Sequence, residues 1–322
     1  MLRVLITAGD PAGIGPEVVL KAMQAPISGV ELVAVGSKTI FDKVAKTLEC
    51  PVVGNILDVD SSLSGIADPT KVLPGIMSAE GAHIQRASFL AAVEEVAAGR
   101  ADAVVTAPWT KALMPLIGEP AFGHTEILAE RFNAPNHVMM LAGPRLRVCL
   151  VTTHTSLREV PDKVTRERIE AVTRTTVAEL KRLYGIARPR VAVLALNPHA
   201  GELGAMGREE IDVIKPTIEA LSAEFAERAE ITGPYPADTL FSRYASGATP
   251  FDAVVCMYHD QGLIPLKTLH FGEAINITLG LPILRTSVDH GSAYDIAWQG
   301  KADAGSLRYA IESAVVMAQR LR

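Results

Sequence analysis

The sequence predicts an α/β protein in which parallel sheets are covered by helices. Short apolar segments recur along the whole chain, and longer segments with helical spacing of apolar residues separate them. No internal repeat or low-complexity tract interrupts this alternation. Strands that alternate with helices of about 10–20 residues are typical of parallel sheets with helices on both faces.

Seven segments have the apolar composition of buried strands, at residues 3–7, 31–35, 103–106, 147–152, 191–196, 253–257 and 275–279. Five segments have helical periodicity, at residues 16–23, 81–98, 165–184, 209–228 and 305–321. The first helix begins with Pro16, which is harmless at the first helical position because its missing N–H has no partner there.

The length of 322 residues suits two domains of common size. We expect a first α/β domain built from residues 1–125 plus 286–322, and a second built from residues 126–285. No segment has the composition of a flexible linker, so we expect strands that cross between the domains rather than a tether.

Composition excludes several classes of protein. The net charge of −5 gives no basic surface for nucleic acid. No apolar run approaches the roughly 20 residues of a membrane span, and the apolar start is too short for a signal peptide. Cys50, Cys149 and Cys256 have no CxxC spacing and are typical of free thiols in a reducing compartment. These features predict a cytoplasmic protein.

Three predicted strands are each followed by a histidine. His154, His199 and His259 come after the fourth, fifth and sixth of the strand segments. The carboxyl ends of parallel strands share one edge, so these imidazoles can converge. Imidazole suits zinc and other divalent transition metals, and three ligands leave positions open for substrate. The alternative, that each histidine is only a polar strand end, stays open from the spacing alone.

Polar residues next to these histidines have two interpretations. Asp260 and Gln261 follow His259, and Glu202 follows His199. They either orient ligands or bind substrate, or they cap loops. Similarly, the motif GHTE at 123–126 opens a predicted helix whose free N–H groups favour an anion, although an N-cap alone also explains it.

The loop GDPAGIGPE at 9–17 follows a strand and precedes a helix, as dinucleotide-binding loops do. It matches neither GxGxxG nor a Walker A motif, so residues that bind a cofactor stay unassigned. Further along, Lys267 follows the predicted ligand His259 by eight residues. Asn276 and Arg285 lie on or beside predicted strands. Lysine and arginine suit carboxylate and phosphate groups, which favours a binding role.

Together, these motifs resemble the 4-hydroxythreonine-4-phosphate dehydrogenase family of pyridoxal phosphate biosynthesis across nearly the whole chain. Their shared order along the sequence makes the resemblance specific. The motifs are GDPAGIGPE at 9–17, GHTE at 123–126, TTH at 152–154 with LR at 157–158, NPHAGE at 197–202, PADTLF at 236–241, MYHDQGL at 257–263 with Lys267, NITLGLP at 276–282 and RTSVDHG at 285–291.

The resemblance implies an isocitrate/isopropylmalate-dehydrogenase-like fold, with two α/β domains, a central cleft, and a homodimer whose active sites lie at the subunit interface. It implies a divalent metal, zinc, magnesium, manganese or cobalt, bound by three histidines of which one comes from the partner subunit. The implied ligands are His154, His199 and His259, and the implied substrate-binding residues are His124, Thr125, Lys267, Asn276 and Arg285.

The family's reaction oxidises 4-hydroxythreonine 4-phosphate with NAD or NADP. The product is a β-keto acid, which decarboxylates to 3-amino-2-oxopropyl phosphate. We expect Lys267 or Asp260 to assist proton transfer. The sequence departs from the family at Trp298, where glycine is usual, and at Thr155 and Ser156, where Ile-Pro is frequent.

Three other functions stay open from the sequence. The first is a dehydrogenase of a related phosphorylated acid, 4-phosphoerythronate or 4-phosphothreonate. The second is a zinc hydrolase, because a metal held by three histidines also activates water. The third is a non-catalytic binding protein on the same scaffold.

Overall fold

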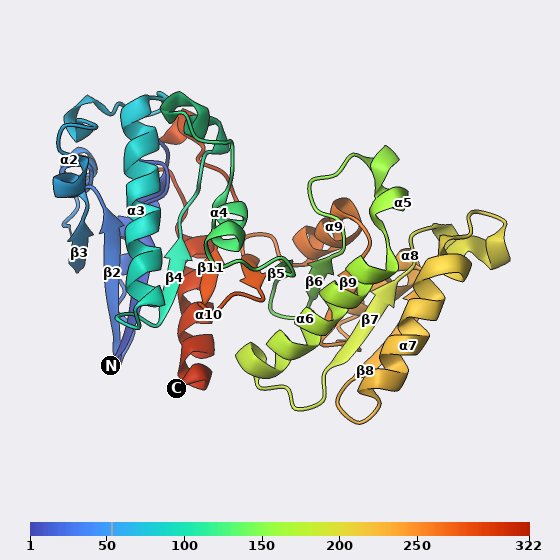
Figure 1. Ribbon diagram of the computed structural model, residues 1–322. Helices are drawn as coiled ribbons and strands as arrows, with labels where there is room; N and C mark the ends of the chain where they lie inside the picture. Colours follow the sequence, from blue (N-terminus) through green and yellow to red (C-terminus); the bar gives the residue numbers. More distant parts are fainter. Residues whose placement is uncertain (53) are drawn as a thin grey trace. The chain divides into compact units, whose positions relative to one another are not determined.

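A computed structural model describes residues 1–52 and 54–322, which divide into two compact units (Figure 1). The first comprises Met1–Asn133, Leu281–Arg320 and Arg322, and the second comprises Ala134–Gly280 with Leu321. The first unit is therefore assembled from both ends of the chain. The domain division predicted at 1–125 plus 286–322 and at 126–285 stays a prediction.

The sheet of the first unit is parallel throughout. Its strands lie in the order β3 (Asn55–Asp58), β2 (Val30–Gly36), β1 (Leu2–Thr7), β4 (Ala103–Thr106) and β11 (Arg285–Ser287). Strands β1 and β4 are almost wholly buried on both faces, as parallel strands between helical layers are. The α/β class predicted from the sequence is confirmed.

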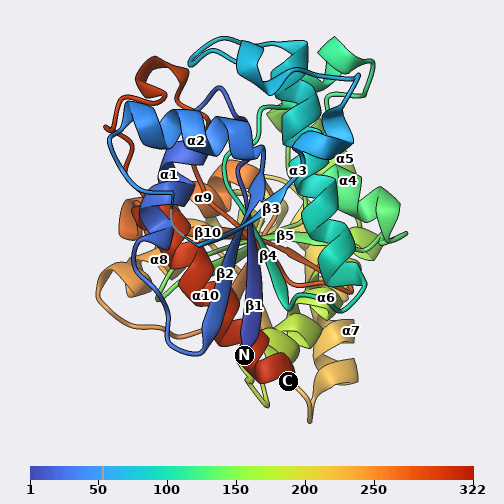
Figure 2. The same ribbon diagram turned by 90° about the vertical axis from the view of Figure 1, so that its left-hand side faces the viewer.

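Helices cover both faces of this sheet. The long helix α3 (Ala79–Ala97) packs on β1, β2 and β4, and Figure 2 shows α10 (Gly305–Leu321) on the opposite face. The Ser78 side chain accepts a hydrogen bond from the backbone N–H of Gly81, which caps α3 as its sequence favours. The remaining helices are α1 (Gly15–Met23), α2 (Lys38–Thr47) and α4 (His124–Arg131), with short 3-10 turns at Asp60–Leu63, Pro69–Lys71, Lys111–Ile117 and Tyr294–Ile296.

The sheet of the second unit is mixed, which corrects the expectation of wholly parallel sheets. Its strands lie in the order β10 (Ile275–Leu279), β5 (Val138–Ala142), β6 (Arg147–Leu150), β9 (Ala253–Cys256), β7 (Arg190–Leu194) and β8 (Glu230–Tyr235). Strand β5 runs antiparallel to both of its neighbours. A tight turn, closed by a hydrogen bond from the Gly143 N–H to the Leu146 carbonyl oxygen, joins β5 to β6. A turn this short reverses the direction of the chain, so the two strands must be antiparallel.

Helices pack against both faces of the second sheet. Helix α6 (Arg166–Tyr184) contacts β10, β5, β6 and β9. On α8 (Ala237–Ala245) and α9 (His259–Leu269), Tyr244 and Leu266 join the buried cluster with the strand residues Leu150 and Leu194. The other helical segments are Leu157–Glu159, α5 (Val160–Lys163), Pro198–Gly204, the π-helical turn Glu210–Ile214 and α7 (Lys215–Phe225).

The seven predicted strands and the predicted helices are present, with ends that shift by a few residues. Four strands were not predicted from the sequence. Strand β3 is short, β5 is rich in methionine, β8 is interrupted by Gly233 and Pro234, and β11 is short and polar. The predicted helix at 209–228 begins as a π-helical turn before α7. Among the described residues, no helix has both the length and the apolar character of a membrane span.

Candidate active site

In the first unit, a buried arginine side chain links the end of a strand to the start of a helix. Arg285 begins β11, Thr106 ends the neighbouring strand β4, and His124 begins α4. Arg285 donates to the Thr106 hydroxyl from Nε at 3.1 Å and from Nη2 at 2.8 Å, and Nη2 also donates to His124 Nδ1 at 2.9 Å. Arg285 is only 3% exposed and His124 only 7%. Two residues predicted to bind substrate are thus in direct contact.

The bond from Arg285 fixes the state of the His124 ring. A guanidinium has donors only, so Nδ1 of His124 must accept. Burial, together with the positive charges of Arg285 and Lys111, lowers the pKa of His124 well below 6.5. The ring is therefore neutral at pH 7 and carries its hydrogen on Nε2. That nitrogen is buried and has no hydrogen-bond partner among the described residues, which leaves a donor for a ligand.

Two aromatic rings hold His124 in place. The ring centroids of Phe89 and Trp109 lie 4.5 Å and 4.7 Å from that of His124. Trp109 is held in turn by a hydrogen bond from Nε1 to the carbonyl oxygen of Phe122 at 3.0 Å. Sequence reasoning missed both aromatic residues, because a single apolar residue on a buried helix or loop carries no functional signal.

The start of α4 adds further groups that suit an anion. The Glu126 carboxylate accepts from the Gly123 N–H at 2.9 Å and from Lys111 Nζ at 3.0 Å, so the predicted helix opening at 123–126 is present. Burial lowers the pKa of Arg285 to about 9, and a nearby carboxylate opposes this change. A buried cation, a neutral imidazole donor and a helix N-terminus together favour a bound phosphate or carboxylate.

In the second unit, two of the three predicted metal ligands lie ring to ring. The centroids of His154 and His259 are 5.8 Å apart. His154 follows β6 and His259 follows the adjacent parallel strand β9. Beyond the strand ends, the Thr152 hydroxyl donates to the Met257 carbonyl oxygen at 2.7 Å, which keeps the two chain segments in register.

Asp260 orients the second of these rings. Its Oδ1 lies 2.7 Å from Nδ1 of His259. A carboxylate in this position fixes the hydrogen on Nδ1 and leaves Nε2 as the nitrogen for a metal, the usual arrangement behind metal-binding histidines. The rings border a cavity of about 220 Å³, whose lining residues are Thr153, His154, Thr155, Leu157, Tyr258, His259 and Asp260.

The pair of rings fits a divalent ion. Imidazoles that bind one Zn²⁺ at about 2.0–2.1 Å have ring centres on the order of 5 to 6 Å apart. The observed separation of 5.8 Å between His154 and His259 agrees with this value. His154 is exposed and the His259 side chain is 35% exposed, so both rings can be reached from solvent.

Within this chain, His199 is not grouped with His154 and His259 as a metal site. It is exposed, on the loop Pro198–Gly204, and its backbone is left-handed with φ of 52°. The left-handed stretch continues through Leu203, which costs roughly 1–2 kcal/mol for each residue other than glycine. Within residues 1–52 and 54–322, no three His, Cys, Asp or Glu side chains are grouped as a metal site. The structure therefore brings together two of the three predicted ligands.

Gln261 joins two of the segments that carry the histidines. Its Oε1 accepts from the Met257 N–H at 2.7 Å, just before His259. Its Nε2 donates to the Ala195 carbonyl oxygen at 2.7 Å, at the end of β7 and upstream of His199. This side chain therefore links two strand ends through backbone groups, which is the loop-capping role among the alternatives that the sequence left open.

Comparison with known proteins identifies the family of the chain. Residues 27–314 match the family model described as pyridoxal phosphate biosynthetic protein PdxA. The chain belongs to this family. The resemblance predicted from its motifs is confirmed.

Individual relatives cover nearly the whole chain. A 4-hydroxythreonine-4-phosphate dehydrogenase from Desulfosudis oleivorans is 44% identical, covering 96% of this chain and 94% of that protein. A D-threonate 4-phosphate dehydrogenase from Pectobacterium atrosepticum is 39% identical, covering 98% and 99%. The crystal structure of a 4-hydroxythreonine-4-phosphate dehydrogenase from Klebsiella pneumoniae superposes with a TM-score of 0.87 at 38% identity, covering 99% and 100%.

The remaining predicted substrate residues lie on two elements of the second unit. Lys267 is half-buried on α9, about 12 Å along the helix from His259 at 1.5 Å per residue. Asn276 lies on β10, and its Oδ1 is buried with no hydrogen-bond partner among the described residues. Thr125, in the first unit, is the second residue of α4 and is half-buried.

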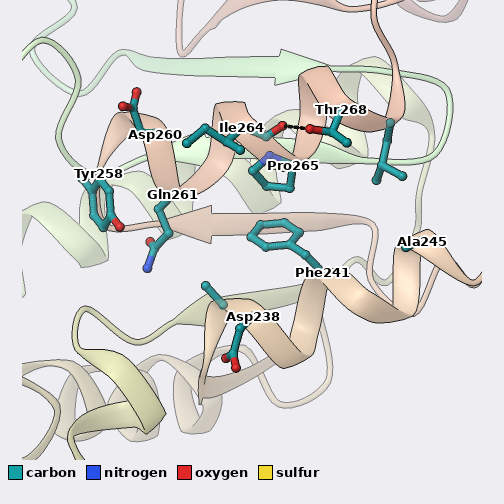
Figure 3. Close-up of a pocket in the computed structure, with 11 residues that line it drawn as sticks. Asp238, Phe241, Ala245, Tyr258, Asp260, Gln261, Ile264, Pro265 and Thr268 are labelled. Carbon is teal, nitrogen blue, oxygen red and sulfur yellow. Dashed lines mark hydrogen bonds between the residues drawn. The ribbon is translucent and has the colours of Figure 1, made fainter.

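A larger and more apolar hollow adjoins the histidine cavity, and the two share Tyr258 and Asp260. Its volume is about 340 Å³. Figure 3 shows Phe241 of α8 pointing toward Pro265 of α9 across it, with Gln261 alongside. The helix α9 that begins at His259 therefore presents polar groups at its start and an apolar wall further on.

The loop at 9–17 is held by residues from near the other end of the chain. Asp10 is buried and accepts from the Ala12 N–H at 3.0 Å, from the Thr110 hydroxyl at 2.6 Å and from the Tyr294 hydroxyl. Trp298 Nε1 donates to the Pro11 carbonyl oxygen at 3.1 Å. These bonds account for the polar residues of the loop, and they assign no residue to a cofactor.

Proposed function

We propose that this chain is a nicotinamide-dependent dehydrogenase that oxidises the secondary alcohol of 4-hydroxythreonine 4-phosphate in pyridoxal phosphate biosynthesis. Relatives with this name are up to 44% identical over nearly the whole chain. The observation that carries the proposal is the buried contact between Arg285 and His124. It supplies a cation and a neutral donor where a phosphorylated acid needs them.

We propose that His154, His199 and His259 bind a divalent metal ion, with one of the three supplied by a second subunit. The ring contact between His154 and His259 and the carboxylate of Asp260 behind His259 support this. When bound, such an ion acts as a Lewis acid on the substrate alcohol. Zinc, magnesium, manganese and cobalt stay the candidate metals. Imidazole ligands suit zinc and other transition metals, whereas magnesium and manganese prefer oxygen ligands.

The chain's own residues bind and orient the substrate. His124, Thr125 and Arg285 of the first unit bind an anionic group, because Nε2 of His124 is buried without a partner among the described residues. Lys267 and Asn276 of the second unit bind substrate as well, and the unsatisfied Oδ1 of Asn276 accepts a donor such as a hydroxyl or an ammonium group.

Lys267 is the residue we assign to proton transfer. The Asp260 carboxylate, the other candidate, lies against His259 and acts there as its orienting partner. The alcohol loses its proton to the enzyme, and the carbon loses a hydride to NAD or NADP. The resulting β-keto acid loses carbon dioxide, because the new carbonyl accepts the electron pair of the breaking bond. The product is 3-amino-2-oxopropyl phosphate.

A homodimer completes the proposal. Large apolar side chains are exposed on the second unit, with Leu203 97%, Phe271 89% and Ile264 63% accessible. Burial of these side chains against a second copy of the chain would remove their apolar surface from water. We also expect the protein in the cytoplasm, where its free cysteines Cys50, Cys149 and Cys256 stay reduced.

The test is reduction of NAD or NADP by the purified protein in the presence of divalent metal. Substrates are 4-hydroxythreonine 4-phosphate, D-threonate 4-phosphate and 4-phosphoerythronate, compared by kcat/KM. The second candidate is the D-threonate 4-phosphate reaction, which the relative with 39% identity favours. Metal-dependent hydrolysis in the absence of nicotinamide would contradict the proposal and identify the protein as a hydrolase.

Mixed dimers test whether one ligand comes from the partner. His154→Ala, His199→Ala and His259→Ala proteins are mixed pairwise after mild dissociation. If one histidine is supplied across the interface, its variant complements each of the other two and restores about a quarter of the sites. The two histidines whose variants fail to complement each other bind the metal from the same subunit. Absence of complementation in every pair contradicts a shared site.

A further inference from the structure

We infer that Glu210 is a positioning residue that fixes the backbone leading to His199 and thereby sets the affinity of that histidine for a metal ion. The inference rests on the metal site proposed above. It concerns a residue that lies outside every motif recognised in the sequence. Its argument comes from the contacts of one buried carboxylate.

The Glu210 carboxylate binds the entrance of the His199 loop at three points. Oε1 accepts from the backbone N–H of Leu196 and from that of Asn197, each at 2.8 Å. Oε2 accepts from Asn197 Nδ2 at 3.0 Å. Glu210 is only 3% exposed, so these bonds are sheltered from water. The carboxylate therefore holds the two residues that lie immediately before Pro198 and His199.

The middle of the loop is shaped around the same carboxylate. Gly201 has φ of 76°, and a Cβ added there would lie 2.6 Å from Glu210 Oε2. The loop thus passes so close to Glu210 that only glycine fits. The residues around Gly201, from His199 to Leu203, are all left-handed. A backbone in this unfavourable conformation persists only when its surroundings impose it. Glu210 bonds the residues just before this stretch and lies close to its centre at Gly201.

Glu210 is itself rigidly supported. It begins the π-helical turn Glu210–Ile214, which runs directly into α7. Ile214 and Thr217 are fully buried on this element. Its neighbour Glu209 also accepts from Asn197 Nδ2, at 2.7 Å. Single π-helical turns are frequent at functional sites, and here the turn aims a carboxylate at a loop that carries a proposed ligand.

The test measures metal binding directly, with Co²⁺ as the probe. Glu210→Gln keeps the shape of the side chain but presents an N–H₂ group to Asn197 Nδ2. We expect the affinity for Co²⁺, measured by visible absorption during titration, to fall about 10- to 100-fold. Hydrogen exchange at the amides of Leu196 and Asn197 increases, while the melting temperature of the metal-free protein changes little. Asp212→Asn, an exposed acid in the same turn paired with Arg208, is the matched control and binds Co²⁺ as the wild type does.

A double variant separates positioning from general destabilisation. If Glu210 acts through His199, Glu210→Gln lowers the affinity in the wild-type background and has no further effect on His199→Ala. An equal loss in both backgrounds, or an unchanged Co²⁺ affinity, overturns the inference. Should Glu210→Gln fail to fold, Asn197→Ala removes the side-chain bonds to Glu210 Oε2 and Glu209 Oε2, keeps both backbone bonds to Glu210 Oε1, and is measured in the same way. If wild type and His199→Ala bind Co²⁺ equally, the proposed metal site itself is wrong, which is a result distinct from failure of the Glu210 assignment alone.

Discussion

Nη2 of Arg285 donates to Nδ1 of His124 across 2.9 Å, and this contact keeps the histidine ring neutral inside the first unit. Protonation of the ring would place a second positive charge next to the guanidinium and break the bond. Burial is the larger cause of the lowered His124 pKa, and the charges of Arg285 and Lys111 add to it. Because the pKa of His124 is lowered in this way, the ring is neutral at pH 7 and Nε2 is a hydrogen-bond donor.

The first prediction concerns stability in mild acid. The unfolded chain protonates His124 below about pH 6.5, whereas the folded chain does not. The unfolded state then binds more protons, so the contribution of His124 to the free energy of unfolding falls by about 1.4 kcal/mol per pH unit below pH 6.5. In His124→Asn, whose amide oxygen still accepts from Arg285, this contribution disappears. Urea unfolding between pH 5 and 7 measures both slopes, and equal slopes would falsify the assignment.

Candidate site residues could be predicted from the sequence where they directly follow strands of the sheet or lie in recognised motifs. His154 and His259 were predicted from their place after two strands, and adjacent parallel strands do bring them together. Arg285 and His124 were predicted as substrate residues from the resemblance, and they are in contact. Patterns of this kind are readable because a strand end fixes the position of the next residue within narrow limits.

Other features were out of reach because they depend on contacts between distant residues. Glu210 holds the loop of His199 from beyond the loop, and nothing in the sequence distinguishes it from Glu209. The antiparallel strand β5 depends on a turn at Gly143 and Pro144. This Gly-Pro pair indicates a turn, but the methionine-rich segment before it does not have the typical composition of a strand. The aromatic rings of Phe89 and Trp109 reach His124 only after α3 has packed.

The second prediction addresses Trp298, the position at which the resemblance noted in the sequence implies glycine. Its φ of 59° is unfavourable for tryptophan, and glycine would relieve roughly 1 kcal/mol. However, the side chain is 5% exposed and donates to the Pro11 carbonyl oxygen, and loss of a buried tryptophan costs about 3–5 kcal/mol. Trp298→Gly is therefore expected to lose about 2–4 kcal/mol in urea unfolding.

Trp298→Phe serves as the control for this substitution. It keeps most of the packing and removes only the hydrogen bond from Nε1, so the expected loss is about 1 kcal/mol. A Trp298→Gly protein as stable as the wild type would show that backbone strain outweighs the packing of the indole.

The third prediction concerns the bridge made by Gln261. Gln261→Leu leaves the Met257 N–H and the Ala195 carbonyl oxygen without their partner. Unsatisfied buried backbone groups cost about 1–3 kcal/mol each, so the free energy of unfolding should fall by at least that amount. Hydrogen exchange at Met257 should become faster. Gln299→Leu, which removes an exposed bond to the Asp295 carbonyl oxygen, should change stability by less than about 0.5 kcal/mol.

The fourth prediction tests proton transfer by Lys267. Lys267→Met keeps the length of the side chain and removes its amine. We expect kcat to fall about 10²- to 10⁴-fold, the range of general acid–base catalysis, with one limb missing from the pH profile. Lys163→Met, an exposed lysine paired with Glu159, is the control and keeps full activity. Wild-type kcat and KM in the Lys267 variant would remove this residue from the mechanism.

The last prediction concerns the geometry of the guanidinium rather than its charge. Arg285 reaches Thr106 through two nitrogens and His124 through one of them, which a single ammonium on a shorter chain cannot reproduce. Arg285→Lys should therefore lower kcat/KM about 10- to 100-fold, since a hydrogen bond to a charged group contributes about 1.5–3 kcal/mol. The loss should appear mainly in KM for the phosphorylated substrate, because the anion is bound equally in the ground state and the transition state. An equal loss in kcat with unchanged KM would instead place the contact of Arg285 at the reacting carbon.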